Sequence, residues 1–161
     1  MGADLRALLW KSAEHGDTPH LPVVALTSGL VLLPLTGKIT TTVLGAGDND
    51  PVVDGFYELT EPVADWARRR SHHGVVAYLH SEFFGGGGFH AAVAWHHGDT
   101  VWGPRFTATS RGEAEDHYTV PDDHRDMAAN MLLRHLGVDR GQHLDEFAAA
   151  GLDQQRWTTD W

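Results

Sequence analysis

Hydrophobic positions near the start of the chain follow a helical spacing. Leu5, Leu8 and Leu9 would share one face of a helix, because residues three and four apart lie above one another on a helical surface. This pattern predicts a short amphipathic helix over residues 3–14 that ends near Gly16.

The next hydrophobic segments favour strands. The runs 23–26 and 30–33 flank the small residues 27–29, which indicates a hairpin or one strand with a break. Pro34 ends the second run because it has no amide hydrogen for the sheet. The threonine-rich residues 36–44 leave the choice between helix and strand open.

A helix is expected after Phe56. Thr60 supplies a hydroxyl cap, Pro62 suits the first turn, and an apolar stripe follows at helical spacing. The residues 68–70 are three arginines that complement the carbonyl end of the helix dipole, an interpretation that we favour over a phosphate site. Gly74 would then close the helix.

The clearest pattern lies in residues 75–106, where β-forming runs alternate with Gly-rich and Gly-Asp turns. It predicts a three-stranded antiparallel meander, and Pro104 moves the third strand to an edge or ends its pairing early. A late helix is expected to start at 121–123 and end at Gly137, and a shorter one to cover 144–150.

Pairing across the predicted turn decides which polar residues meet. With the turn centred on the middle two glycines, Glu82 lies opposite Ala91. His80 and Glu82 then share one face of the sheet, and His90 lies on the opposite face. A glycine bulge would shift the register by one residue and bring His90 to the same side, so this alternative stays open.

The four glycines, Gly85, Gly86, Gly87 and Gly88, could also suggest a phosphate loop. A nucleotide loop requires a helix after the glycines, however, and a strand-like run follows them here. Turn geometry, or the close approach of another backbone, is the better explanation.

Length and composition indicate one α+β domain over residues 1–161. A chain of 161 residues is near the usual size of a single domain, and 42% apolar residues can fill one core. We expect an antiparallel sheet, with the meander around residues 75–106, packed by about three or four helices.

Charge narrows the classes of partner. Twenty-two acidic residues against twelve basic ones give a formal net charge of −10, which opposes the phosphate neutralisation that nucleic-acid binding requires. A basic protein or a cationic small molecule suits this field better, although acidity also serves solubility alone.

The absence of cysteine excludes disulfides, thiolate zinc sites and cysteine nucleophiles. No apolar segment reaches the roughly 18 residues of a membrane span, and the first residues lack the apolar core of a secretory leader. We therefore expect no membrane association and a cytoplasmic location. No esterase elbow, metalloprotease motif or serine with a supporting base occurs, so no catalytic residue and no cofactor is predicted.

Twelve histidines are the remaining unusual feature, and His80 with Glu82 is the candidate site. A structural hydrogen-bonded pair is the leading interpretation, ahead of a partner contact and of catalysis or metal ligation. His90, Trp95 and Trp102 are further candidate binding residues, and no bound metal is predicted.

Residues 77–95 resemble the central motif of a family of small uncharacterised bacterial proteins, mainly from actinobacteria. The family motif is similar to AY-x-x-x-E-[YF]-F-G-G-x-G-x-Q-A-A-x-x-W, with His90 at the glutamine position here. The segments VLLPLT, MLLRHLGV and LDEFAAAGL extend the resemblance loosely. The resemblance implies no activity.

Small acidic proteins are often neutralising partners of toxins, which is an analogy of size and charge. Our leading hypothesis is a non-catalytic interaction protein of this immunity-like kind, with an acidic surface that binds a protein partner. The alternative is a small enzyme or metal-dependent binder built around His80 and Glu82. The tryptophans of segment 156–161 predict that it docks on the body of the protein or on a second copy, as in a homodimer.

Overall fold

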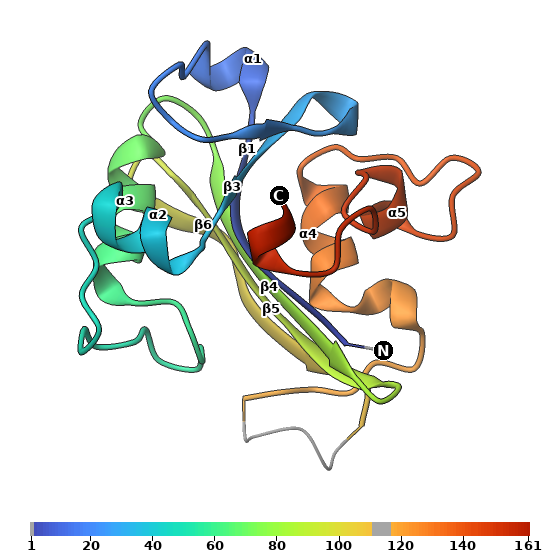
Figure 1. Cartoon of the computed structure of the whole chain (residues 1–161). Coiled ribbons are helices and arrows are strands. Elements are labelled where there is room, and N and C mark those ends of the chain that lie inside the picture. The colour runs from blue at the N-terminus through green and yellow to red at the C-terminus, as the bar shows by residue number, and fades with distance from the viewer. Residues whose placement is uncertain (1, 111–116) are drawn as a thin grey trace.

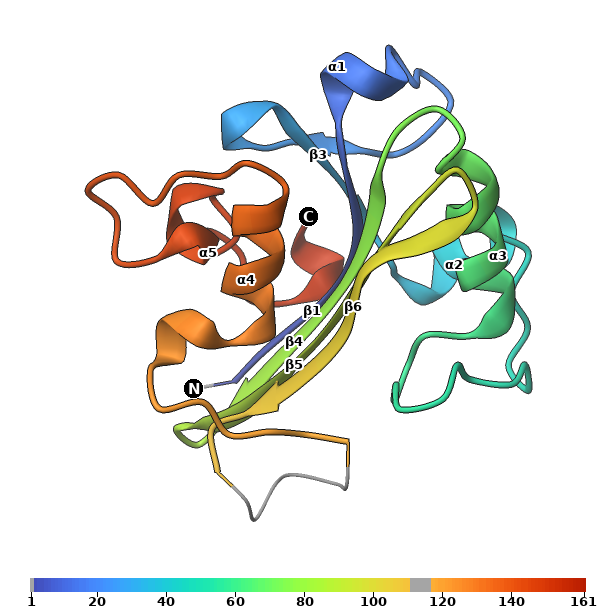
Figure 2. The same ribbon diagram turned by 180° about the vertical axis from the view of Figure 1, so that it is seen from behind.

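The computed structural model of the chain describes residues 2–110 and 117–161. A six-stranded antiparallel sheet of order β2-β3-β1-β4-β5-β6 divides the molecule, with helices on both faces (Figure 1 and Figure 2). Its strands are β1 (Ala3–Lys11), β2 (Val24–Ala25), β3 (Leu30–Pro34), β4 (Val76–Phe84), β5 (Gly87–His96) and β6 (Asp99–Ala108). The predicted α+β class and antiparallel sheet are confirmed.

Five α-helices occur in the described ranges, and two of them are single turns. They are α1 (Ser12–His15), α2 (Gly37–Thr42), α3 (Glu61–Arg70), α4 (Ala128–His135) and α5 (Glu146–Ala149). The helices α2 and α3 lie on one side of the sheet, and α4 and α5 lie on the other (Figure 1). None of these helices is long and apolar enough to cross a membrane.

The helix predicted over residues 3–14 is wrong, because this segment forms β1 and only α1 at its end is helical. β1 lies between β3 and β4, with packed side chains on both faces of the sheet. Residues 7–10 are therefore all buried, and no polar face alternates with an apolar one. A strand buried on both faces can reproduce the apolar spacing of a helix by chance.

The predicted hairpin is confirmed. β2 and β3 pair antiparallel across the short 3-10 turn Thr27–Gly29, and β3 ends at Pro34. The threonine-rich segment forms α2, whose start is capped by the Thr36 hydroxyl accepting a hydrogen bond from the Ile39 N–H.

The helix after Phe56 is also confirmed, as α3, and the three arginines lie in its last turn. Thr60 is its N-cap residue, but the predicted hydroxyl cap is wrong, because the Thr60 side chain makes no capping hydrogen bond. It ends with Ser71 as its cap, before Gly74. The Arg70 guanidinium lies 4.8 Å from the centroid of the Trp10 ring, so this arginine has a structural role in covering the core.

The meander is confirmed as β4, β5 and β6, with β6 at the edge of the sheet. Gly85 and Gly86 form its first turn, with φ values of 59° and 85° that L side chains rarely adopt. The turn therefore lies one position earlier than predicted, and Glu82 pairs with Phe89 instead of Ala91.

A register change of two residues leaves every side chain on its predicted face. His80 and Glu82 share one face of β4, and His90 on β5 points to the other. The pairing of β4 with β5 runs without a bulge from Val76 to Phe84, so the alternative that would have joined the two histidines is wrong.

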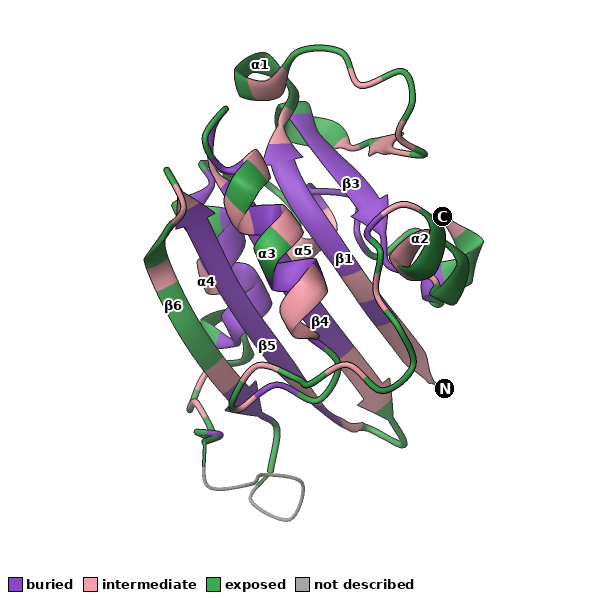
Figure 3. Cartoon of the chain, turned by 90° about the vertical axis from the view of Figure 1, so that its left-hand side faces the viewer, coloured by how far each residue is buried: buried purple, intermediate pink, exposed green. Residues whose placement is uncertain are grey.

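Each face of the sheet carries its own core. On the side of α2 and α3, the largest fully buried side chains are those of Trp10, Tyr78 and Trp95. On the other side, small and aliphatic residues of the sheet pack against Leu132 and Leu133 of α4. Figure 3 shows the central strands as buried and most of β6 as exposed.

The late helix starts later than predicted. Residues 121–123 precede a 3-10 turn, and α4 begins at Ala128, whose N–H donates to the Thr107 hydroxyl at 2.9 Å. This tertiary cap is invisible in the local sequence. The end of α4 before Gly137 and the position of α5 within 144–150 agree with the prediction.

The C-terminal segment 156–161 docks on the body of the protein, which is one of the two alternatives that the sequence analysis predicted. The Asp4 N–H donates to the Arg156 carbonyl, and Trp157 forms a parallel bridge with Asp4. The Thr158 hydroxyl accepts from the Arg6 N–H and donates to the Asp4 carbonyl. This segment therefore pairs with the start of β1, where β3 no longer reaches.

Candidate functional site

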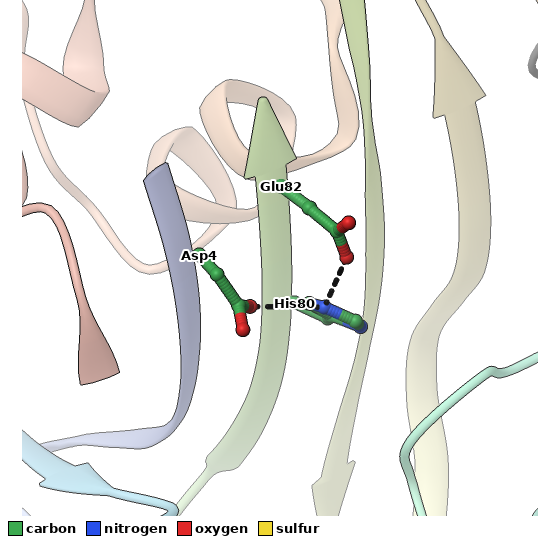
Figure 4. Close-up of side chains that lie close together, drawn as sticks. All are labelled: Asp4, His80 and Glu82. Carbon is green, nitrogen blue, oxygen red and sulfur yellow. Dashed lines mark ion pairs between the residues drawn. The ribbon is translucent and has the colours of Figure 1, made fainter. Parts of the chain in front are cut away.

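A cluster of three ionisable side chains lies on the α2 and α3 side of the sheet, near the end of β4. In the register of β1 and β4, Asp4 lies opposite Glu82, and Arg6 lies opposite His80. The carboxylates of Asp4 and Glu82 both point at the imidazole of His80 (Figure 4). We call Asp4, His80 and Glu82 the acid–histidine cluster.

The distances within the cluster are short. His80 Nε2 lies 3.2 Å from Asp4 Oδ1 and 3.4 Å from Glu82 Oε2. Neither contact has the alignment of a hydrogen bond, and within the described residues both nitrogens of His80 are buried without a hydrogen-bond partner. His80 is only 2% exposed, so its ring lies almost entirely inside the protein.

The electrostatics of the cluster lower the pKa of one of its carboxyl groups, that of Asp4. Burial alone would raise the pKa of the Asp4 carboxyl, but the contact with His80 and the charge of Arg6 outweigh burial and hold this pKa below its ordinary value. Arg6 reaches Asp4 at 3.6 Å and Glu58 at 3.3 Å, so it joins the cluster to the segment before α3.

A small aromatic pocket opens beside the cluster. Its side-chain walls are Tyr57, Glu82, Phe84 and Phe89, and its volume is about 250 Å³. The Phe89 ring meets the edge of His80 at 4.9 Å and of Tyr57 at 5.1 Å between ring centroids. Tyr57 and Phe84 are 41% and 51% exposed, so their rings are accessible from outside. We call this hollow the aromatic pocket.

A second hollow of about 380 Å³ lies on the other side of Arg6, against α2. Arg6, Glu58, Thr60 and Tyr78 are among its lining residues. Burial raises the pKa of the Tyr78 hydroxyl, which therefore stays protonated, and this hydroxyl has no hydrogen-bond partner among the described residues. The hollow has both polar and apolar lining residues and shares none of them with the aromatic pocket.

The other predicted site residues lie apart from the cluster. His90 is 4% exposed on the opposite face, where its Nδ1 accepts a hydrogen bond from the Ala129 N–H at 3.1 Å. The Trp95 ring is buried in the core beneath Arg68, at 2% exposure, and offers no surface to a partner. Trp102 on β6 is half-buried and stacks on His135.

Asp4, Arg6 and Tyr57 were missed by the sequence prediction. Asp4 and Arg6 alternate with apolar neighbours, but the sequence analysis assigned this segment to a helix. Their register against β4 depends on the pairing of two strands that are more than seventy residues apart in the chain. Tyr57 lies in a loop with no periodic signal. Treating residues 3–11 as a strand would have placed Asp4 and Arg6 on a common face.

Chemically, the cluster can hold a positive charge between two carboxylates. Ser81 has its side chain on the opposite face of β4 from His80 and Glu82, and so supplies no nucleophile to them.

No family model matches the chain, and comparisons with curated proteins and with solved structures found no match. The resemblance of residues 77–95 to an actinobacterial family stays a prediction. Function must therefore be inferred from the geometry of the site.

Proposed function

We propose that this protein is a non-catalytic interaction protein that binds a basic protein partner, and that the aromatic pocket receives a lysine or arginine side chain. The observation that carries the proposal is the meeting of three aromatic rings with the Glu82 carboxylate in one accessible hollow. This proposal develops the leading hypothesis from the sequence by giving it a site.

Aromatic faces and a carboxylate favour the same ligand. A cation within about 6 Å of a ring centroid is attracted by the ring quadrupole, and a carboxylate adds a charge-assisted hydrogen bond. The pocket volume of about 250 Å³ is below the roughly 300 Å³ at which small-molecule sites usually begin. It therefore suits a single long side chain better than a large metabolite.

The charge around the pocket supports the same choice. Three carboxylates, of Asp4, Glu58 and Glu82, lie near one another on this side of the sheet, and Arg6 offsets one of them. The whole chain carries a formal net charge of −10. Such a field speeds the association of a basic partner and repels acidic ones.

A short basic peptide tests the pocket directly. We would titrate acetyl-Lys-Arg-Lys-amide into the isotope-labelled full chain and follow the amide and aromatic NMR signals, with acetyl-Glu-Gln-Glu-amide as the reversed-charge control. We expect the basic peptide alone to shift the signals of Tyr57, Glu82 and Phe89. Shifts of equal size with both peptides, or none near the pocket, would contradict the proposal.

Variants separate the pocket from general charge. Phe84→Ser and Glu82→Gln should each weaken peptide binding by about threefold or more, since each removes one part of the recognition. Leu144→Ser is the matched control, because Leu144 is an apolar side chain of 71% exposure next to α5, on the other side of the sheet. An equal loss in all three variants would exclude a specific role for the pocket.

Partner association should depend jointly on salt and pH. The chain has twelve histidines against ten excess negative charges. Burial lowers the pKa of His15 and keeps His90 neutral, but protonation of histidines at their ordinary pKa would still remove most of the acidic field toward pH 5. Capture from a native lysate at pH 7.5 and low salt should yield a partner that is lost at pH 5.5, at high salt and with Phe84→Ser. A partner retained in all four conditions would contradict electrostatic binding through this pocket.

A toxin-neutralising, immunity-like role in the cytoplasm is the specific form of this function that we propose. It is supported by the small size and the acidity of the chain, which suit a basic toxin. A captured partner whose toxicity is suppressed by the protein, and restored by Phe84→Ser, would support this form. A partner without any toxic activity would restrict the proposal to protein binding.

A further inference from the structure

We infer that the acid–histidine cluster of Asp4, His80 and Glu82 is a binding site for one divalent transition-metal ion, for which Zn²⁺ is the best-suited probe. The inference does not rest on the proposed partner. It rests on four features of the cluster: spacing, charge, burial and donor chemistry.

The spacing of the donor atoms fits a shared ion. Zinc binds imidazole nitrogen and carboxylate oxygen at about 2.0 to 2.2 Å, and two ligands of a tetrahedral ion at these bond lengths are about 3.3 to 3.5 Å apart. His80 Nε2 lies 3.2 Å from Asp4 Oδ1 and 3.4 Å from Glu82 Oε2. All three donor atoms lie within 4.8 Å of one another, so a small closure completes the set.

Charge balance gives the second reason. Asp4 and Glu82 lie directly opposite each other on neighbouring strands, where like charges destabilise a sheet unless a positive charge separates them. Arg6 reaches Asp4 but shares its charge with Glu58, and the ion pair of Glu82 within the described ranges is the one with His80. A divalent cation at the cluster would neutralise both carboxylates.

Burial of His80 is the third and independent observation. Its side chain is 3% exposed, and it directs Nε2 toward both carboxylates without a hydrogen bond to either (Figure 4). Ligands around a common ion are misaligned for hydrogen bonding to one another, because each lone pair points at the ion instead of at its neighbour. A buried ring nitrogen without a partner is costly, and an ion at the cluster would supply a partner for Nε2.

Donor chemistry selects the class of ion. One imidazole with two carboxylates suits Zn²⁺ and related first-row ions better than Ca²⁺ or Mg²⁺, which prefer sites built from oxygen alone. Three protein ligands leave one tetrahedral position for water. The side chains of Asp4 and Glu82 are 25% and 33% exposed, so solvent can reach that position.

The test is calorimetric titration of the metal-free full chain with ZnCl₂. We expect one tightest site per chain, and a loss of about tenfold or more in its affinity in each of Asp4→Asn, His80→Gln and Glu82→Gln. Glu58→Gln is the matched control, since it removes a neighbouring carboxylate that is not a donor, and it should change the affinity by less than about threefold.

A second measurement locates the ion without any variant and so does not depend on the folding of mutants. Mn²⁺ broadens NMR signals near it, and a substoichiometric amount should selectively broaden residues 4, 80, 82 and 89 of the unmodified chain. Broadening centred on the consecutive residues His96 and His97 instead would overturn the inference. A tightest Zn²⁺ site whose affinity is unchanged in the three ligand variants would also overturn it. So would the absence of any Zn²⁺ binding tighter than millimolar.

The metal and the proposed partner would share Glu82. A bound ion would remove negative charge from the aromatic pocket, so Zn²⁺ should weaken binding of the basic peptide. Phe84→Ser leaves the metal donors intact and should retain Zn²⁺ affinity. Metal binding without peptide binding, or the reverse, therefore distinguishes failure of one proposal from failure of the other.

Discussion

His80 and His90 lie on neighbouring strands of one sheet, are almost equally buried, at 2% and 4% exposure, and have opposite surroundings. His80 faces two carboxylates. His90 faces α4, where the Ala129 N–H donates to its Nδ1 and the Phe147 ring stacks beside it. Burial of a histidine thus says little about its role, and the face of the sheet determines the role.

The two environments have different chemical consequences. Burial, together with the charges of His80 and His124, lowers the pKa of His90 to about 3, so His90 is neutral and accepts a hydrogen bond at physiological pH. His80 faces two carboxylates and offers Nε2 as a ligand atom to an ion. One histidine is therefore a structural anchor, and the other belongs to a candidate binding site.

Disrupting the turn between β4 and β5 is expected to have the largest effect, because this turn sets the faces of both histidines. A Cβ added at Gly88 would collide with the Glu82 carbonyl and with Phe83, and overpacking of this kind costs about 3 kcal/mol. At Gly85 nothing lies within contact distance, so alanine there costs only about 1 kcal/mol for its positive φ. Urea unfolding of Gly88→Ala and Gly85→Ala should show this order, and equal losses would contradict it.

Acid should destabilise the protein through His90. Its folded pKa of about 3 lies below the value of about 6.5 in the unfolded chain, so only the unfolded state takes up this proton as the pH falls below 6.5. The contribution of His90 to the free energy of unfolding is therefore fully present above pH 7. It decreases by up to about 1.4 kcal/mol per pH unit as the pH falls, and by about 2 to 3 kcal/mol in total at pH 4.5.

His90→Gln isolates this contribution. Glutamine keeps an acceptor for the Ala129 N–H but does not titrate, so the variant should lose about 2 kcal/mol less than the parent between pH 7.5 and pH 4.5. His20→Gln is the control, since His20 is exposed and should give the parental curve. Parallel curves for all three proteins would show that His90 is not the buried neutral group described above.

The smallest losses of stability should come from substituting two threonines. Thr158 bonds to the backbone of β1 beside His80, and Thr107 caps the helix whose Ala129 N–H bonds to His90. Thr158→Val removes both hydrogen bonds that the Thr158 hydroxyl makes to β1 and leaves the Arg6 N–H without this acceptor, at a cost of about 1 to 2 kcal/mol. Thr107→Val removes the cap of Ala128 at a similar cost. The imidazole NMR signals of His80 should move only with Thr158→Val, and those of His90 only with Thr107→Val. Movement of both signals in either variant would mean that the two faces are coupled.

The sequence by itself determined the meander and helix α3. It reduced the β2 and β3 hairpin, the edge position of β6 and the faces of His80 and His90 to two alternatives each. These features depend on neighbours close in the chain, such as the alternation along β4 and the positive φ values at Gly85 and Gly86, which local residue chemistry fixes. The face assignment survived an error in register because side chains repeat every two residues along a strand.

Only the tertiary structure decided the identity of residues 3–11 as a central strand, the start of α4 at Ala128 and the composition of the candidate site. From Ala7 to Trp10, β1 is covered on both faces, which removes from this part the polar alternation by which a strand is recognised. Asp4 meets His80 and Glu82 only because β1 pairs with β4, and the Thr107 cap of α4 likewise comes from β6. Such long-range pairings leave no periodic trace in the chain, since their stability comes from contacts between distant segments.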